Sequence, residues 1–323
     1  MYTKLLIQLL VLPLLLFAGC RNTERSAPLV GFVEAFEDAT ISQARAGFVE
    51  ALSDSGFRES DGTIEIIYRN AQGDIPTLSQ IVNYYLTEEV DLMATSTTLS
   101  SIAAIQRVKD IPIFMMVSPE PKRMDILDDQ GQAPANLFGV SESLAYIDTS
   151  FAIIPRLVKP RGQELVVGMI YNQAEPQSED ALRAVQAMAE KLGVRIEAMP
   201  VNSSADAQLV TQSLLNKNID AFFANPDNTV FASFETILKN CNQRNVPVFT
   251  SEAGLVKRGA VAAFGADLFQ WGYQAGAQAA RYLKQGNADG LAIELVKTRK
   301  RVYNPEAARK FGLNFPDTYE AID

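Results

Sequence analysis

Short apolar segments alternate with segments of helical periodicity along most of the chain, and this alternation constrains the fold more than any other feature. Residues 29–35 form a short apolar run, and apolar side chains in residues 41–55 recur at helical spacing until Gly56. Further strands are predicted at 63–68, 92–95, 111–117, 137–140, 165–171, 195–201, 221–224, 246–250, 261–265, 293–296 and 301–303. Further helices are predicted at 76–88, 99–108, 144–158, 179–192, 205–215, 230–244, 267–284 and 305–311. This order requires parallel sheets with right-handed crossovers.

The strand and helix pattern occurs twice along the chain. A polar, irregular segment with three prolines at 118–135 interrupts it, and the order restarts at residue 165. Two successive units, each with a little over a hundred of the 323 residues, are what two domains would produce. The predicted fold class is therefore α/β, with two doubly wound parallel-sheet lobes.

The composition removes several classes of function. The chain contains no histidine, so a Ser-His-Asp or Cys-His nucleophile, a histidine metal site and a histidine proton shuttle are excluded. A net charge of −9 argues against binding nucleic acid through phosphate contacts. The sequence has neither a G-x-G-x-x-G fingerprint nor a Walker motif, and no metal-ligand cluster. We therefore expect neither a cofactor nor a metal.

The N-terminal segment has the pattern of an export signal. One early charge, Lys4, precedes an apolar run that is too short to cross a bilayer. The ending Phe17-Ala18-Gly19-Cys20 resembles the bacterial lipobox, in which the cysteine is lipidated and becomes the new N-terminus. Residues 1–20 are thus predicted to be a lipoprotein signal peptide, and residues 21–28 a flexible tether. The alternative is an ordinary secretory signal cleaved nearby. Either places the protein in the periplasm or at the cell surface.

The two cysteines are not expected to form a disulfide. The lipobox accounts for Cys20, and Cys241 falls in the middle of the predicted helix 230–244. We therefore expect Cys241 to be an unpaired, partly buried helix residue.

The segment 221–230 is the most informative part of the sequence for function. A short buried strand at 221–225 is broken by Pro226, and a helix follows that Asp227, Asn228 or Thr229 can cap. Ligands of parallel α/β sheets bind at the carboxyl ends of the strands, which places Asp227 at the mouth of a cleft. Its carboxylate has two interpretations, a helix N-cap or an anion that faces a ligand ammonium.

Other predicted strands also end in polar side chains. Hydroxyl, amide and carboxylate groups follow them at Glu34, Ser96, Thr97, Thr98, Asn172, Ser178, Asn228 and Glu252, and Phe36 lies beside Glu34. Hydroxyls and free N–H groups at a helix start suit a carboxylate, and an opposing Asp suits an ammonium. Together they predict a site for the zwitterionic head of an α-amino acid. For each residue alone, helix capping is the alternative, and Phe36 can equally be a core side chain.

Seven short motifs between about residues 30 and 312 are typical of a known family. They are Arg69-Asn70-Ala71-Gln72-Gly73-Asp74, Ile111-Pro112-Ile113, Phe138-Gly139-Val140-Ser141, Ile170-Tyr171-Asn172, Pro226-Asp227-Asn228-Thr229-Val230, Pro247-Val248-Phe249 and Val256-Lys257-Arg258-Gly259-Ala260. Through them the chain resembles the ABC transporter substrate-binding lipoproteins of the tryptophan/tyrosine-type family, which have the type I periplasmic-binding fold.

The resemblance implies a monomeric protein of two lobes that closes on a small ligand and delivers it to an ABC permease in the membrane. Residues 29–141 and 265–290 would form the first lobe, and residues 142–264 and 291–323 the second. A multi-strand hinge near Ser141 and Gly265 would join them. The ligand head group would meet Ser96, Thr97, Thr98, Ser178, Asp227 and Asn228, and Phe36 would line the side-chain pocket.

Three departures from the family pattern leave the ligand open. Asp38-Ala39 replaces the usual His-Pro pair after the first strand. Glu252 stands for the usual Asp, followed by Ala253-Gly254-Leu255 in place of Thr-Asp-Ser. The rim segment Pro119-Glu120-Pro121 is also unusual. The ligand is thus an amino acid, a related compound or a different apolar small molecule.

Three other functions compete with solute import. A sensor lipoprotein of the same fold would bind a ligand and signal to a membrane partner without transport. An enzyme would need a catalytic constellation, and paired carboxylates such as Glu34 and Asp227 are the nearest approach to one. A transcription regulator of this fold is excluded by the export signal and by the missing DNA-binding segment. We expect no enzymatic activity.

Overall fold

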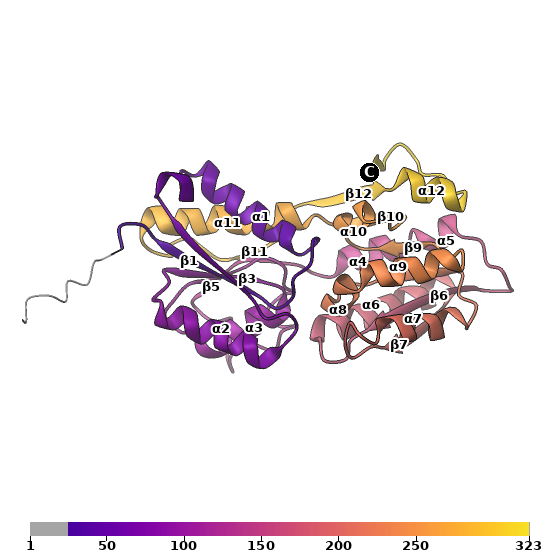
Figure 1. The fold of residues 1–323 in the computed structure, drawn as a ribbon, viewed down its shortest axis with the longest axis horizontal. Helices are drawn as coiled ribbons and strands as arrows, with labels where there is room; N and C mark the ends of the chain where they lie inside the picture. The colour runs from indigo at the N-terminus through magenta and orange to yellow at the C-terminus, as the bar shows by residue number, and fades with distance from the viewer. Residues whose placement is uncertain (1–24, 323) are drawn as a thin grey trace, which may run out of the picture.

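The computed structural model describes residues 25–322. Two lobes lie side by side along the long axis of the molecule (Figure 1). The predicted signal peptide with Cys20, and the first residues of the predicted tether, lie outside the described residues. Within residues 25–322, no helix combines the length and apolar character that crossing a membrane requires.

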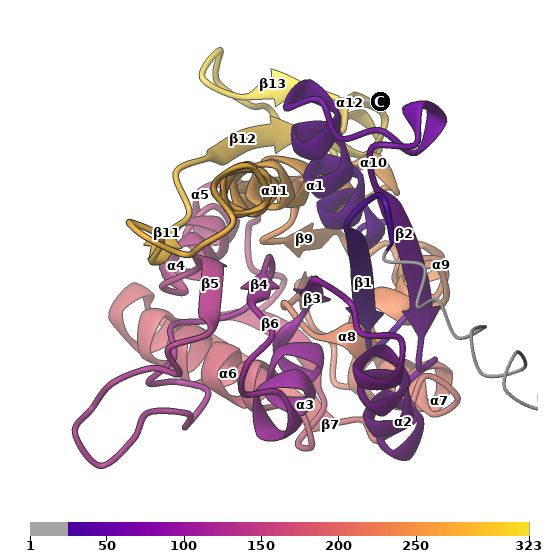
Figure 2. The same cartoon turned by 90° about the vertical axis from the view of Figure 1, so that its left-hand side faces the viewer.

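The first lobe is built on a six-stranded parallel sheet with the strand order β11-β5-β4-β3-β1-β2. Side chains of β1 alternate between its two faces: Val30 and Phe32 join one hydrophobic cluster, and Leu29 and Val33 another. Helices α1 and α11 cover the first face, and α2 and α3 the second (Figure 2). The elements are β1 (Leu29–Glu34), α1 (Ser42–Asp54), β2 (Glu65–Asn70), α2 (Ile75–Thr87), β3 (Leu92–Ser96), α3 (Thr98–Arg107), β4 (Ile113–Met115), β5 (Leu137–Ser141), α11 (Leu268–Gln285) and β11 (Ile293–Leu295), with a short 3-10 helix at Glu59–Asp61.

The second lobe has a four-stranded parallel sheet with the order β7-β6-β8-β9. In β8, Phe223 packs toward α4 and α6, whereas Phe222 and Ala224 pack toward α7 and α9. A small sheet follows, in which β12 pairs antiparallel with β10 and parallel with β13. The elements are α4 (Ala145–Phe151), α5 (Ile154–Leu157), β6 (Leu165–Tyr171), α6 (Pro176–Leu192), β7 (Val194–Pro200), α7 (Ala207–Leu215), β8 (Ala221–Ala224), α8 (Asn228–Ala232), α9 (Phe234–Gln243), β9 (Val248–Thr250), α10 (Ala253–Lys257), β10 (Ala262–Ala266), β12 (Arg299–Tyr303), α12 (Pro305–Phe311) and β13 (Glu320–Ala321).

The element order agrees with the alternation in the sequence, and the differences have local causes. The helix predicted at 144–158 is two helices, because Pro155 lacks the N–H that would continue the first. The helix predicted at 230–244 is likewise divided at Ser233 into α8 and α9. Cys241 is a free cysteine on α9, and it is fully rather than partly buried.

Two predicted segment assignments differ from the structure. The predicted division put residues 291–323 in the second lobe, but β11 pairs with β5 and therefore belongs to the sheet of the first lobe. The predicted tether 21–28 is anchored in its last part. The Arg25 guanidinium donates hydrogen bonds to the carbonyl oxygens of Glu88 and Glu89, and Ala27 is buried.

The chain crosses between the lobes three times. The crossings follow β5 at Glu142, β10 at Asp267 and β11 at residues 296–298. Ser141 ends β5 and its carbonyl accepts from the Val296 N–H at 2.9 Å, which joins two crossings. The predicted pivots at Ser141 and Gly265 lie beside the first two. At Gly265 a Cβ atom would come within 1.7 Å of the Ser251 carbonyl oxygen, so only glycine fits there.

Candidate ligand-binding site between the lobes

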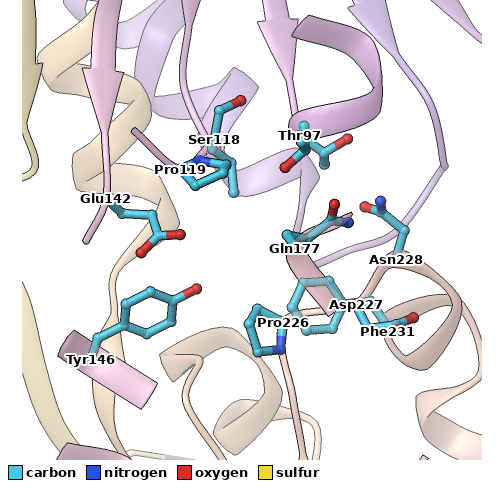
Figure 3. A pocket seen from close by; sticks show the side chains of 12 residues that line it. Thr97, Ser118, Pro119, Glu142, Tyr146, Gln177, Pro226, Asp227, Asn228 and Phe231 are labelled. Carbon is cyan, nitrogen blue, oxygen red and sulfur yellow. The ribbon is translucent and has the colours of Figure 1, made fainter. Parts of the chain in front are cut away.

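A cavity lies where the carboxyl ends of the two parallel sheets face one another (Figure 3). Its lining comes from both lobes and consists of Thr97, Thr98, Val117, Ser118, Pro119, Glu142, Tyr146, Gln177, Pro226, Asp227, Asn228 and Phe231. The volume of about 30 Å³ is room for about two water molecules. The structure therefore describes a closed arrangement, and a larger ligand requires the lobes to separate before it can bind.

The N-terminus of α3 forms the wall of the first lobe. No side chain caps this helix, and the hydroxyl oxygens of Ser96, Thr97 and Ser100 are buried without a hydrogen-bond partner among the described residues. Thr97 has φ 79° and ψ 162°, a conformation that is costly for a β-branched residue. Free N–H groups and the positive end of a helix dipole attract an anion. This wall is thus suited to a carboxylate.

A chain of hydroxyl groups holds the neighbouring part of the same wall. The Ser101 hydroxyl lies 2.8 Å from the hydroxyl of Thr95 and 2.8 Å from that of Ser118. It also donates to the Thr97 carbonyl at 3.1 Å. These bonds fix Ser118, which lines the cavity after β4.

Asp227 dominates the wall of the second lobe, and its carboxylate caps α8. Oδ1 accepts from the Val230 N–H at 2.9 Å, and Oδ2 accepts from the Asn172 N–H at 2.7 Å and the Ser178 hydroxyl at 2.5 Å. The capping interpretation of Asp227 is therefore correct. It leaves room for the ammonium interpretation, because Asp227 lines the cavity and Oδ1 accepts one hydrogen bond from the described residues.

A second carboxylate, Glu175, supports this wall and was missed by the sequence analysis. Oε2 accepts from the backbone N–H and the side-chain amide of Asn228, at 2.9 and 2.8 Å, and from the Gln177 amide at 2.6 Å. Oε1 accepts from the Thr229 hydroxyl at 3.0 Å. The available signal was its place before Pro176, since a residue preceding a first-turn proline occupies the N-cap position.

The two buried carboxylates of this wall, Glu175 and Asp227, both have raised pKa values. Burial, and then the charge of Asp227, raise the pKa of Glu175 to about 8. Burial also raises the pKa of Asp227, while its hydrogen bonds from Ser178 and the backbone oppose the rise. Two like charges in one buried network cannot both be ionised at low cost, so a positive group in the cavity would stabilise them.

Glu142 and Tyr146 close the cavity on the side of the hinge, and the sequence analysis identified neither. The Glu142 carboxylate accepts a hydrogen bond from the Leu144 N–H, at a turn where Leu144 has φ 64°. Burial raises the pKa of Glu142 to about 7, with this hydrogen bond opposing the rise. Glu142 follows β5 and so has the strand-end pattern that could have identified it, whereas Tyr146 lies in the first turn of α4, which no such pattern marks.

The structure brings Thr97, Thr98, Asp227 and Asn228 together around the cavity. The other predicted site residues are not part of its lining. Asn172 and Ser178 lie behind Asp227 as its donors, and Ser96 is buried at the end of β3. Their roles in binding remain predictions.

Glu34, Phe36 and Glu252 also lie away from the lining. Glu34 is buried 3.6 Å from Arg45, and burial raises its pKa while Arg45 opposes the rise. Phe36 packs against hydrophobic clusters of both lobes. Glu252 forms a β-bridge with Ala266 beside the hinge, and burial raises its pKa to about 8.

An ion-pair network joins the lobes beside the cavity. Arg258 of the second lobe donates to the Asp38 carboxylate at 2.6 Å and to the Thr40 hydroxyl at 3.0 Å, both in the first lobe. It also contacts Glu235 and the Phe231 carbonyl of its own lobe. Ile41, which follows Thr40, is fully buried in a hydrophobic cluster of the second lobe. These contacts hold the closed arrangement.

Comparisons with known proteins agree on the architecture. The model of the ABC transporter substrate binding protein family matches residues 30–321. A tyrosine-binding protein of Clostridioides difficile (strain R20291) is 27% identical over 280 residues, which cover 87% of this chain and 79% of that protein. A conserved domain protein from Vibrio cholerae O1 biovar eltor superposes with a TM-score of 0.79 at 25% identity, covering 90% of this chain and 96% of that one.

A further solved structure is an ABC domain from Streptococcus pneumoniae in complex with L-Trp. It superposes with a TM-score of 0.79 at 20% identity and covers 91% of this chain and 97% of that one. The matches extend over both lobes and the hinge, which confirms the predicted fold class and family resemblance. The family binds solutes and does not transform them, so the expectation that the chain is not an enzyme is also confirmed. The chain belongs to the family of ABC transporter substrate-binding proteins.

Proposed function

We propose that the protein captures a free amino acid between its lobes and delivers it to an ABC permease. The observation that carries this proposal is the placement of an uncapped helix N-terminus opposite Asp227 across one cavity. The ligand carboxylate would accept from the N–H groups at the start of α3 and from the Thr97 hydroxyl, which has no partner among the described residues. One similar protein is named a tyrosine-binding protein, and another was solved in complex with L-Trp. Both support an amino acid as ligand.

The ammonium group would lie against the second lobe. Asp227 Oδ1 accepts one internal hydrogen bond, and Gln177 Oε1 accepts none from the described residues although it is buried at the cavity. A cation there would pair with the carboxylates of Asp227 and Glu175 and so offset the cost of their burial. One ligand would thereby satisfy groups on both walls.

Capture would proceed by hinge motion. The cavity of about 30 Å³ is too small for an amino acid, so binding begins with the lobes apart. Rotation at the three crossings would then bring the walls against the ligand, with more space between them than the cavity of about 30 Å³ provides, and draw Arg258 back toward Asp38. The ligand would favour closure because it contacts both walls at once.

Calorimetry with tyrosine and two analogues tests this proposal. L-Tyrosine carries both head groups, tyramine lacks the carboxylate, and 3-(4-hydroxyphenyl)propionate lacks the ammonium. We expect L-tyrosine to bind and each analogue to bind at least about a hundredfold more weakly, because an analogue leaves one buried wall unpaired. Equal affinity of an analogue and the amino acid would contradict the zwitterion site. Native mass spectrometry of the purified protein would identify a co-purified ligand directly.

We also propose that a lipid on Cys20 anchors the protein outside the cytoplasm as a monomer. The lipobox-like ending at Cys20 supports the anchor, and membership of a substrate-binding family supports the location. The wild type should incorporate labelled palmitate, and the Cys20→Ser variant should not. Incorporation of the label by the variant would contradict lipidation at this residue.

A further inference from the structure

The cavity has a second polar end, away from the groups assigned to the amino-acid head. Glu142 and Tyr146 lie on one side of the cavity, and Asp227 and Asn228 lie on the other (Figure 3). Glu142 follows β5 at the first crossing, and Tyr146 is in the first turn of α4. This end is therefore part of the hinge.

Both side chains present polar atoms that have no internal partner. Glu142 is 4% exposed, and one carboxylate oxygen accepts from the Leu144 N–H while the other accepts nothing from the described residues. Tyr146 is 5% exposed, its ring packs edge-on against Trp271, and its hydroxyl bonds to none of residues 25–322. In Figure 3 the carboxylate and the hydroxyl both point into the cavity. Neither atom is among the fully buried unpaired atoms of the described residues, so both are accessible from the cavity and free to bond to a ligand.

No cation lines this end of the cavity. The twelve lining residues include the carboxylates of Glu142 and Asp227 but no Lys or Arg. The cation that acts on Glu142 from nearby is Arg123, which lies 3.7 Å from Asp180. The carboxylate of Glu142 is thus available to a donor on the ligand.

Apolar groups also line the cavity. Val117, Pro119, Pro226 and Phe231 line it together with the two polar ends. A ligand that spans both ends therefore needs a head group, an apolar middle and a polar tip.

We propose that Glu142 and Tyr146 form a distal subsite that selects amino acids whose side chain ends in an N–H or O–H donor. This inference rests on the proposed function, because the head group must bind at the opposite end. A buried acceptor discriminates strongly against a ligand without a donor, since such a ligand leaves the acceptor desolvated and unpaired. Burial raises the pKa of Glu142, and the single hydrogen bond from Leu144 only partly opposes the rise.

The Glu142→Gln variant inverts the polarity of the subsite. The Leu144 N–H fixes one atom of the side chain, and in glutamine that atom must be the amide oxygen. The NH₂ group then faces the cavity and offers a donor where the carboxylate offered an acceptor. A ligand donor would meet another donor, so the preference should disappear without a change in side-chain size.

Two pairs of ligands isolate the tip of the side chain. L-Tyrosine and L-phenylalanine differ by one hydroxyl, and L-lysine and L-norleucine differ by a terminal ammonium. By calorimetry, the wild type should bind the donor-bearing member of at least one pair about tenfold or more tightly than its partner. In Glu142→Gln this ratio should fall to within about threefold, and Tyr146→Phe should reduce it to an intermediate value.

The control is Glu190→Gln, which makes the same chemical change at an exposed position of α6, outside the cavity lining. It should keep the wild-type ratio. If Glu142→Gln does not fold, as judged by circular dichroism, Tyr146→Phe carries the same test. Equal affinities within both pairs for the wild type, or a ratio unchanged in the variants, would overturn the subsite and leave the proposed function standing. Binding of none of the four amino acids would overturn both.

Discussion

The two walls of the cavity differ in how far their buried polar groups are hydrogen-bonded within the protein. On the second lobe, the carboxylates of Asp227 and Glu175 accept hydrogen bonds from the backbone and side chains around them. On the first lobe, the hydroxyls of Ser96 and Thr97 have no partner within residues 25–322, and α3 begins without a cap. The wall of the second lobe is largely satisfied internally, with Gln177 Oε1 as an exception, whereas the wall of the first lobe leaves its hydroxyls and helix start unpaired.

This difference separates groups that hold geometry from groups that are free to bind. A satisfied network resists displacement and places Asp227 and Asn228 accurately. An unsatisfied and strained segment lowers stability, and it persists where the surrounding fold enforces it. Four variants and conditions test whether the walls differ in this way.

The largest effect is expected from Asp227→Ala. The change removes the acceptor for the N–H groups of Asn172 and Val230 and for the Ser178 hydroxyl. We expect the free energy of unfolding to fall by about 3 kcal/mol and amino-acid binding to be lost. Chemical denaturation and calorimetry measure the two effects.

The control for Asp227→Ala is Glu190→Ala, which removes an exposed carboxylate from α6 of the same lobe. It should change the free energy of unfolding by less than about 0.5 kcal/mol. An Asp227→Ala protein as stable as the wild type would show that the wall of the second lobe is not built on this carboxylate.

Arg258→Met tests whether contacts outside the cavity bring the walls together. The variant loses the bond to the buried Asp38 and the contacts with Glu235 and the Phe231 carbonyl, but no residue of the cavity lining is replaced. We expect ligand affinity to fall about tenfold, which corresponds to about 1.4 kcal/mol, because the closed state loses the ion pair that joins the lobes. Small-angle scattering of the ligand-free variant should show a larger radius of gyration.

The neighbouring Lys257→Met is the matched control for Arg258→Met, since Lys257 is exposed and forms none of these bonds. Affinity and radius of gyration should stay at their wild-type values. A compact Arg258→Met protein with wild-type affinity would show that the ion pair does not stabilise the closed state.

The pH dependence of stability distinguishes the carboxylate side of the cavity from the hydroxyl side. Burial raises the pKa of Glu252 to about 8 and that of Glu142 to about 7, above their unfolded values near 4.5. The folded state therefore holds more protons, and its stability falls as pH rises from about 5 to about 8. We expect the melting temperature of the ligand-free protein to fall by at least about 3 °C over this range.

Glu252→Gln should flatten that pH profile, because the amide does not ionise. A melting temperature that rises between pH 5 and pH 8 would have the wrong sign for buried carboxylates. It would then be necessary to assign the titration to other groups.

The smallest effect is expected from Thr97→Gly. Glycine adopts the φ 79° and ψ 162° of Thr97 without strain, so the free energy of unfolding should rise by about 0.5–1 kcal/mol. The lost hydroxyl should at the same time weaken amino-acid binding by about threefold. Thr98→Gly, one residue into α3, should instead lower stability by a similar amount. If both variants change the free energy of unfolding in the same direction, Thr97 stores no strain.

The sequence predicted the architecture well because the alternation of apolar runs and amphipathic helices is a local property. The polar residues that follow β3 and β8 were also identified correctly as neighbours, since parallel strands end at one edge of each sheet. Thr97 and Asp227, which are 130 positions apart in the chain, line the same cavity for this reason.

Residues that depend on tertiary packing were not predictable in the same way. Tyr146 reaches the cavity through the turn at Leu144, whose left-handed backbone has no glycine to mark it. Glu252 has the expected strand-end position, but its backbone pairs with Ala266 and draws it to the hinge. β11 was assigned to the wrong lobe because its three residues carry no information about which sheet they join.

The placement of β11 and α11 also sets the order in which the halves can be finished during synthesis. The half that leaves the ribosome first lacks its edge strand and one covering helix until residues 268–295 have been translated. By then the four-stranded sheet encoded by residues 165–250 is already complete. The N-terminal half must therefore wait, with one face of its sheet covered by α1 alone, for a segment made after most of its partner.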